Sequence, residues 1–274
     1  MELTGVFVPM ITPFDASGAV ALPALRRLAH EVLDAGATGL VALGTTGEPA
    51  ALTDGEREQV LDVLSRVCAT HGAPLLGPPD ERCAAAVSLV PPFVRPGPDG
   101  VVAHFTALAA TSPVPLVVYH VPPRTGQSLD AATLRRIGAL DRVIGIKYAT
   151  GALDADLVAL LADPPPGFAV LSGDDVFLSP LLALGAAGGI LASAHVATGR
   201  FVALTRAWRC GDLDAAGKLG HHLAPLSAAL FAEPNPTVIK AVLHAHGRIP
   251  TPAVRLPLLA ATASATQAAL RLAG

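Results

Sequence analysis

The chain has 274 residues and a formal net charge of −3 at pH 7, and 51% of its residues are hydrophobic but only 4% aromatic. This slightly acidic balance argues against a nucleic-acid or anionic-membrane partner, because either would require a basic patch. No apolar run reaches the ~18 residues of a membrane span, and Met1–Thr4 has no basic region before an apolar stretch, so we expect no secretory signal and a cytoplasmic location.

Short β-branched runs alternate with longer helical patterns along most of the chain. Strands are predicted at Val6–Ile11, Gly39–Leu43, Pro74–Leu76, Ala86–Val90, Leu116–Val121, Val143–Tyr148, Ala169–Ser172 and Gly189–Ala192. Strands interleaved with helices indicate parallel βα units, and eight is the number that closes such a sheet into a barrel. The predicted fold class is therefore α/β, a (β/α)₈ TIM barrel.

Helices are predicted between these strands. They span Leu22–Ala35, Thr53–Thr70, Val101–Ala110, Asp130–Leu140, Leu153–Ala162, Phe177–Leu184 and Thr198–Cys210. Thr53-Asp54-Gly55-Glu56 is a capping-box pattern that marks a helix start. Gly36, Gly72 and Gly185 follow helices in the position where a helix end prefers glycine.

Past the last predicted strand the chain continues beyond one further helix. Leu213–Phe231, Pro236–His246 and Pro252–Ala273 are predicted helices with no strand between them. We therefore expect a barrel over residues 1–212 and, packed against it, a C-terminal helical extension over residues 213–274. The two parts form one catalytic unit.

One connection departs from the βα pattern. Only Gly77–Ala86 is available between the third and fourth predicted strands, whereas a parallel crossover needs roughly 10–12 residues including its helix. Pro78-Pro79 limits any helix there to about one turn. The third barrel helix is predicted to be missing or vestigial.

Catalytic groups of such barrels lie at the carboxyl ends of the strands and on the loops that follow them. Gly44-Thr45-Thr46-Gly47-Glu48 comes directly after the second predicted strand. Its glycines allow a tight turn whose N–H groups and hydroxyls converge on an anion. A polar turn that caps the next helix is the alternative interpretation.

Lys147 ends an otherwise apolar strand, and lysine is almost never buried without a partner. Strand alternation places Val143, Gly145 and Lys147 on one face, where Gly145 leaves space beside the lysine stem. Removal from water favours the neutral amine, which attacks a ketone to form a Schiff base. The alternative is a surface lysine at a strand end.

Two further side chains follow from the fifth predicted strand. Tyr119 shares a face with Val117 and Val121, where a phenol can relay protons to and from a carbinolamine. Arg124, on the next loop, offers the planar fork that binds a carboxylate bidentately. A packed tyrosine and a solvated arginine remain the alternative.

Small residues end the seventh and eighth strands, in Ser172-Gly173-Asp174-Asp175 and Gly188-Gly189-Ile190. They leave room for a ligand over the lysine. The three cysteines are odd in number and far apart, so they form neither a disulfide framework nor a zinc signature. We expect no metal and no cofactor.

Together these segments resemble the dihydrodipicolinate synthase and N-acetylneuraminate lyase family over nearly the whole chain. The resemblance rests on Gly5–Phe14, Gly44–Glu48, Arg95-Pro96, Tyr119–Gly126, Ile144–Lys147, Ser172–Asp175, Glu233–Pro236 and Arg255–Pro257. Within the family, Pro123–Gly126 and the Glu-Pro-Asn-Pro stretch are similar to the synthase branch. The sialic acid lyase branch lacks the arginine.

The resemblance implies a role for each candidate residue. Lys147 forms the Schiff base with pyruvate, Tyr119 is the proton donor and Thr45 relays protons. Thr46 holds the pyruvate carboxylate, Ile190 backs the pyruvate, Gly173 belongs to the substrate site, and Arg124 receives the carboxylate of the aldehyde. The implied reaction is an aldol-type condensation to hydroxy-tetrahydrodipicolinate by a homo-oligomer, a dimer or a tetramer.

Three departures from the family pattern bear on this implication. Phe93 stands where the synthases carry a second relay tyrosine lent across a subunit interface. The glycine-rich loop and helix after the third strand are replaced by Pro78–Cys83. His120 and His195 replace asparagines. A pyruvate-dependent aldolase of specialised metabolism with another aldehyde, or a non-catalytic ligand-binding relative, therefore stays open.

Overall fold

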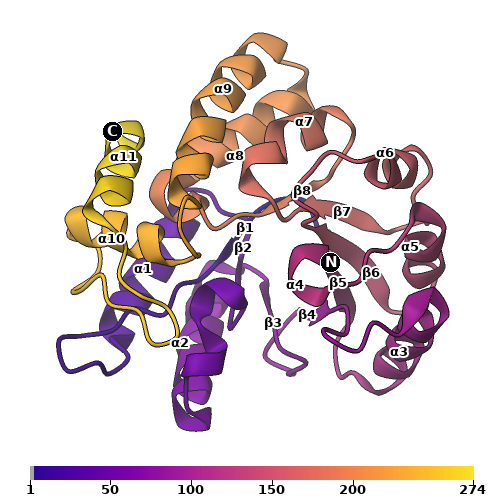
Figure 1. Cartoon of the computed structure of the whole chain (residues 1–274), viewed down its shortest axis with the longest axis horizontal. Coiled ribbons are helices and arrows are strands. Elements are labelled where there is room, and N and C mark those ends of the chain that lie inside the picture. The colour runs from indigo at the N-terminus through magenta and orange to yellow at the C-terminus, as the bar shows by residue number, and fades with distance from the viewer. Residues whose placement is uncertain (1–2) are drawn as a thin grey trace.

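The computed structural model describes residues 3–274; Met1 and Glu2, part of the segment expected to carry no secretory signal, lie outside the described residues. Parallel strands form a closed barrel in the order β1 to β8, and β8 pairs with β1 (Figure 1). The predicted TIM-barrel class is confirmed. The strands are β1 Gly5–Pro9, β2 Gly39–Val41, β3 Leu75–Gly77, β4 Ala85–Leu89, β5 Leu116–His120, β6 Val143–Tyr148, β7 Ala169–Ser172 and β8 Gly188–Ile190.

Helices surround the barrel and continue past it at the C-terminal end (Figure 1). They are α1 Leu22–Asp34, α2 Asp54–His71, α3 Gly97–Thr111, α4 Pro122–Thr125, α5 Ala131–Gly138, α6 Ala155–Ala162, α7 Leu178–Ala183, α8 Ala194–Cys210, α9 Leu213–Leu230, α10 Thr237–Ala245 and α11 Ala263–Ala273. Short 3₁₀ helices are η1 Thr45–Gly47, η2 Pro49–Ala51 and η3 Asp175–Phe177. Each predicted helix overlaps one of the longer helices.

The start and end of α2 follow the predicted local signals. The Thr53 hydroxyl accepts from the Glu56 backbone N–H, and the Glu56 carboxylate accepts from the Thr53 N–H, so the capping box is confirmed. At the other end Gly72 adopts φ 62°, a left-handed conformation that glycine takes without a steric penalty.

The connection between β3 and β4 contains no helix within residues 78–84, all of which are described. Its turn is held instead by Arg82, whose guanidinium pairs with Asp80 at 2.7 Å and with Glu58 of α2 at 2.9 Å. The predicted loss of the third barrel helix is confirmed.

The predicted helix start at Pro252 is wrong for an identifiable reason. Residues 252–262 are irregular, and only α11 remains of the predicted helix from Pro252, because Pro257 lacks an N–H and interrupts a helical ladder. Helix α8 begins at Ala194, but its backbone is non-helical at Ala197, so the helix that runs on to Cys210 starts after this kink, at the predicted Thr198. The single turn α4, which carries Arg124, was not predicted.

The barrel interior is filled by one layer of apolar side chains. These are Leu3, Phe7, Val41, Leu76, Ala85, Val117, Leu171 and Ile190. Simple alternation had predicted that Val143 shares this face with Lys147, and this prediction is wrong. The β5–β6 register shifts between Leu116 and Val117, so Val143 lies on the other face. Val143 packs in the outer cluster under the helices instead, and Ile144 packs against the interior layer.

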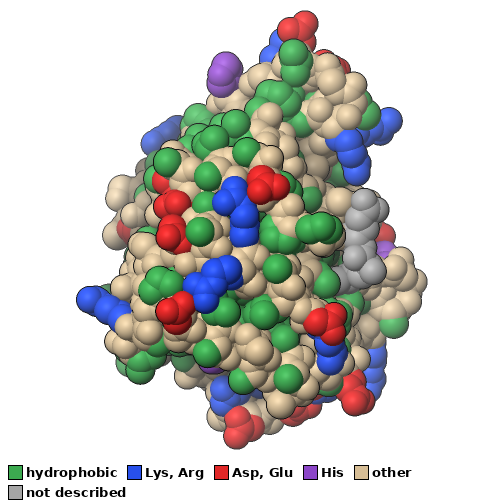
Figure 2. All heavy atoms as spheres, turned by 90° about the vertical axis from the view of Figure 1, so that its right-hand side faces the viewer, with side chains coloured by type: hydrophobic (Ala, Val, Ile, Leu, Met, Phe, Trp, Pro, Cys, Tyr) green, Lys and Arg blue, Asp and Glu red, His purple; other side chains and the backbone are tan. Residues whose placement is uncertain are grey.

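The C-terminal helices share a core with the barrel. Buried side chains of α9, α10 and α11 belong to the same cluster as those of β1, α1, α2 and α8. The boundary predicted at residue 212 stays a prediction. Figure 2 shows one side of the molecule, where positive and negative side chains are interspersed among apolar ones.

Among residues 3–274, no helix is long and apolar enough to span a membrane. The cytoplasmic location expected from the sequence stays a prediction.

Candidate active site

The loop of residues 44–48 forms one wall of the site, directly after β2. Its two threonines lie in η1, with Thr46 buried and Thr45 exposed. The loop is flanked by two non-glycine residues of left-handed backbone, Leu43 at φ 54° and Glu48 at φ 55°. Such conformations cost roughly 1–3 kcal/mol each, so the surrounding structure must hold this loop in place.

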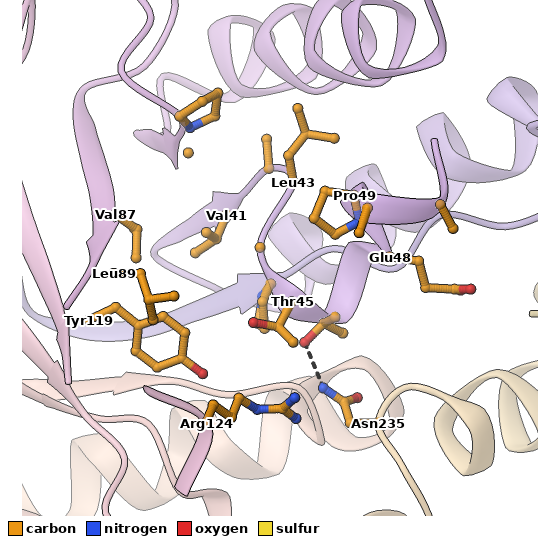
Figure 3. Close-up of a pocket in the computed structure, with 18 of the residues that line it drawn as sticks. Val41, Leu43, Thr45, Glu48, Pro49, Val87, Leu89, Tyr119, Arg124 and Asn235 are labelled. Atoms are coloured by element: carbon orange, nitrogen blue, oxygen red, sulfur yellow. Dashed lines mark hydrogen bonds between the residues drawn. The ribbon is translucent and has the colours of Figure 1, made fainter. Parts of the chain in front are cut away.

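Contacts from distant segments hold the loop. The Thr12 hydroxyl, from the segment after β1, donates to the Gly47 carbonyl at 2.8 Å. Asn235, which precedes α10, donates its amide N–H to the Thr46 hydroxyl at 2.9 Å (Figure 3). Within residues 3–274 the backbone N–H groups of Thr45 and Thr46 have no acceptor, which leaves two donors for a bound anion.

A buried ion pair fixes the end of the same loop. The Glu48 carboxylate accepts from Lys240 Nζ at 2.7 Å, and the two side chains are 2% and 0% exposed. Its other oxygen accepts from the Arg255 backbone N–H at 2.9 Å. Lys240 Nζ also lies 4.1 Å from the ring centroid of Phe14. Burial lowers the pKa of Lys240 to about 8.

Lys147 and Tyr119 meet at the centre of the site. They are paired residues of the neighbouring strands β5 and β6. Lys147 Nζ lies 4.3 Å from the centroid of the Tyr119 ring. Both side chains are half-buried. Both side chains line the same cavity, and their predicted catalytic roles stay predictions.

The glycine that makes room for the lysine stem is Gly173, which follows β7. A Cβ there would lie 2.9 Å from both Cγ and Cε of Lys147. Gly145, which the strand pattern had indicated, is needed elsewhere, because its Cβ would lie 2.6 Å from the Ala169 carbonyl oxygen. The prediction for Gly145 is wrong, since its space is used by the neighbouring strand.

Two adjacent carboxylates follow Gly173. Asp174 accepts from the Gly151 N–H at 2.7 Å, and burial raises the pKa of Asp174. Asp175 accepts from the Ser193 N–H at 2.5 Å. Burial raises the pKa of Asp175 to about 6, and its second oxygen has no partner among residues 3–274.

One cavity with two lobes lies over Lys147. The polar lobe, about 180 Å³, is lined by Gly173 and both aspartates. The apolar lobe, about 590 Å³, extends over the ends of β2, β3 and β4. Residues lining both lobes include Lys147, Tyr119, Thr45, Thr46, Arg124 and Ile190. All seven candidate residues therefore come together around one cavity.

Three of the departures from the family pattern, Phe93, His120 and His195, lie outside this cavity, whereas Pro78 and Pro79 line its apolar lobe. Phe93 is 88% exposed, has φ 70° and does not line the cavity of its own chain. His120 is buried behind Tyr119, and burial lowers its pKa to about 4. His195 accepts from the Ile11 N–H at 3.2 Å and bonds the Ala192 carbonyl at 2.9 Å, which ties the loops after β1 and β8.

Several contributors to the site were not identified from the sequence. Asn235 belonged to the Glu-Pro-Asn-Pro motif, but nothing in its spacing indicated a contact with Thr46. The Glu48–Lys240 pair joins residues 192 positions apart. Asp174 and Asp175 were noted only as part of a segment of small residues. A buried acid directly after a strand was the available signal for Asp175.

The closed barrel, with a lysine among polar groups at the carboxyl ends of its strands, defines a lyase of the class I aldolase type. The chain belongs to the dihydrodipicolinate synthetase family, whose model matches residues 2–77 and 80–273. The break in this match falls at Pro78-Pro79, in the connection that lacks a helix. The family, fold and enzyme class implied by the resemblance are confirmed.

Individual relatives cover nearly the whole chain. It is 36% identical to the 4-hydroxy-tetrahydrodipicolinate synthase of Moorella thermoacetica, over 96% of this chain and 94% of that protein. The chloride-inhibited dihydrodipicolinate synthase of Acinetobacter baumannii, complexed with pyruvate, has a TM-score of 0.91 at 30% identity and covers 99% of both chains. The Bacillus anthracis dihydrodipicolinate synthase has a TM-score of 0.92 at 26% identity, covering 100% of this chain and 98% of that one.

Proposed function

We propose that this protein is a pyruvate-dependent Schiff-base lyase that condenses pyruvate with an aldehyde, as a 4-hydroxy-tetrahydrodipicolinate synthase does. The observation that carries the proposal is the place of Lys147, whose amine lies beside Tyr119 at the junction of the two lobes. The Moorella thermoacetica relative carries that synthase name, and the Acinetobacter baumannii structure contains pyruvate.

In the first half-reaction the neutral amine of Lys147 adds to C2 of pyruvate. The ketone oxygen takes up protons and leaves as water, and a C=N bond to Nζ remains. The Tyr119 hydroxyl donates and accepts these protons, with Thr45 as relay. The pyruvate carboxylate binds the Thr46 hydroxyl and the unpaired N–H groups of Thr45 and Thr46, and Ile190 packs against its carbon skeleton.

In the second half-reaction the imine loses a proton from its methyl carbon and becomes an enamine. That carbon attacks the aldehyde carbon, and the aldehyde oxygen takes up a proton. The Arg124 guanidinium has no hydrogen-bond or ion-pair partner among residues 3–274, and Arg124 lines both lobes. It is therefore available to bind a carboxylate bidentately where the aldehyde carries one.

We also propose that the protein works as a homo-oligomer, a dimer or a tetramer. Phe93 and Val94 are 88% and 71% exposed, and a contiguous exposed apolar patch commonly marks an interface. Their loop contacts the one that carries Arg124, because the Phe93 N–H donates to the Thr125 carbonyl at 3.3 Å.

Reductive trapping tests the proposed function. Borohydride in the presence of pyruvate should leave one reduced pyruvate adduct, mapped by mass spectrometry to Lys147. The chain offers internal controls, because its other lysines are Lys218, which is exposed, and Lys240, which is buried in its ion pair. Lys147→Ala should abolish the adduct and Lys218→Ala should leave it unchanged. An unmodified parent protein at saturating pyruvate would overturn the proposal.

A further inference from the structure

The two lobes over Lys147 differ in what they can hold. The polar lobe, about 180 Å³, is smaller than the ~300–1,000 Å³ of pockets that enclose whole ligands, whereas the apolar lobe, about 590 Å³, lies within that range. Pyruvate must reach Lys147 and the threonines at the junction of the two lobes, and it is too small to fill the apolar lobe as well. The apolar lobe therefore remains as space for a second substrate.

One side of the apolar lobe is hydrocarbon. Val41 and Leu43 come from β2 and the residues after it, and Val87 and Leu89 come from β4. In Figure 3 Tyr119, Arg124 and Asn235 lie on the opposite side of the cavity from Val41, Leu43 and Pro49. Prolines and leucines from residues 78–79 and 256–258 complete the lobe.

The charged residues of this lobe are already paired, apart from Lys147 and Arg124. Glu48 is bound by Lys240 at 2.7 Å and by the Arg255 N–H at 2.9 Å. The Arg255 guanidinium binds both oxygens of Glu56, at 2.6 and 2.7 Å. A substrate ammonium group in this lobe would find no free carboxylate among the described residues that line it, and an unpaired charge away from water is strongly unfavourable.

The lobe is linked to a feature particular to this chain. The connection between β3 and β4 is short and places Pro78 and Pro79 at the rim, where the family match is interrupted. Barrel substrate specificity is set by the βα loops at this end. A changed loop at β3 therefore indicates a changed substrate.

We propose that the aldehyde acceptor carries an apolar substituent, an alkyl chain or an aromatic ring, that binds in the apolar lobe. This inference rests on the proposed function, and it deepens that function by naming the acceptor class. Leu89 and Val87 contact the substituent, and the aldehyde carbon lies next to the enamine on Lys147. The enamine carbon bonds to the aldehyde carbon, whose oxygen takes up a proton, and water then hydrolyses the imine to release a 4-hydroxy-2-oxo acid.

A chain-length series tests this proposal. Purified protein is given pyruvate and either acetaldehyde, propanal, butanal, pentanal or hexanal, with benzaldehyde as an aromatic probe and L-aspartate semialdehyde as the charged comparison. Burial of one CH₂ group contributes about 0.8 kcal/mol, so kcat/KM should rise about fourfold per added carbon until the lobe is filled. Hexanal and benzaldehyde should then be better acceptors than L-aspartate semialdehyde.

A matched pair of leucine variants separates the lobe from general effects. Leu89 is 37% exposed and lines the lobe, whereas Leu184, 43% exposed, lies outside the cavity. Leu89→Ala should lower kcat/KM for hexanal by at least tenfold, since it removes three carbons from the wall of the lobe and each buried carbon accounts for about fourfold. The same variant should change acetaldehyde far less, and Leu184→Ala should change neither.

Reductive trapping with pyruvate alone distinguishes the two ways to fail. If the pyruvate adduct forms but kcat/KM is flat along the series and L-aspartate semialdehyde is the better acceptor, the apolar acceptor is wrong and the pyruvate lyase stands. That flat series is also the result if Phe93 of a second copy fills the lobe. If no pyruvate adduct forms, the proposed function itself fails.

Discussion

Removing Lys240 should destabilise the protein strongly, because it leaves a carboxylate buried without its counter-ion. In Lys240→Met the Glu48 side chain, 2% exposed, keeps the Arg255 N–H as its remaining partner. Breaking a buried pair from one side costs about 3–5 kcal/mol. With an unfolding entropy of ~2.1 cal/mol/K per residue, the 274 residues give a fall in Tm of roughly 5–9 °C.

The same variant should weaken pyruvate binding, because Glu48 ends the loop that carries Thr45 and Thr46. We expect the pyruvate KM to rise while the adduct on Lys147 still forms at saturating pyruvate. The fall in Tm and the weaker pyruvate binding are measurable on one preparation, by calorimetry and by borohydride trapping over a range of pyruvate concentrations.

A double variant decides whether the unpaired charge is the cause. Glu48→Gln with Lys240→Met removes both charges and should be more stable than Lys240→Met alone, because buried pairs replaced as a whole lose little stability. Lys218→Met, on the exposed surface of α9, is the control for loss of a lysine. The reasoning is refuted if the double variant melts no higher than the single one, or if Lys218→Met lowers Tm equally.

Two further predictions concern the Lys147 stem and the buried histidine. Gly173→Ala places a Cβ 2.9 Å from Lys147 Cγ and Cε and should slow adduct trapping about 100-fold, the effect of a ~1 Å misplacement. Gly217→Ala is the control, because its Cβ meets nothing within 4 Å, and it should form the adduct at the parent rate. Equal trapping rates for both variants would contradict the steric argument. Because burial lowers the pKa of His120 from 6.5 to about 4, the unfolded state binds more protons between these values and stability rises with pH across that window. In urea titrations, His120→Asn should reduce the rise of the unfolding free energy with pH by up to about 1.4 kcal/mol per pH unit. An unchanged pH dependence would refute the assignment of this rise to His120.

The barrel could be predicted because its signals are local. Each strand is a short apolar run and each long helix has its own start or stop residues, so the βα alternation is visible without tertiary contacts. The predicted face of Val143 failed because a register shift beside Leu116 changes the alternation. The predicted helix from Pro252 failed because residues 252–262 follow contacts with distant segments, such as the Arg255 pair with Glu56.

The candidate site could be predicted in part for a geometric reason. Carboxyl ends of parallel strands in a barrel meet at one rim, so Lys147, Tyr119 and the threonines had to lie near one another. The space beside Lys147 could not be assigned, because it depends on which neighbouring strand end approaches the stem. That neighbour is Gly173, from β7, while Gly145 on the lysine's own strand accommodates the Ala169 carbonyl.

The C-terminal segment completes the candidate active site as well as covering the barrel. The loop of residues 44–48 has left-handed backbone at Glu48, which is unfavourable without external contacts. Asn235 binds Thr46, Lys240 binds the Glu48 side chain, and the Arg255 backbone binds its second oxygen. All three contacts come from residues after 212, so a barrel cut at that position would lose the groups that hold the loop of residues 44–48. If this loop binds pyruvate as proposed, we expect substrate binding to depend on folding of the C-terminal segment onto the barrel.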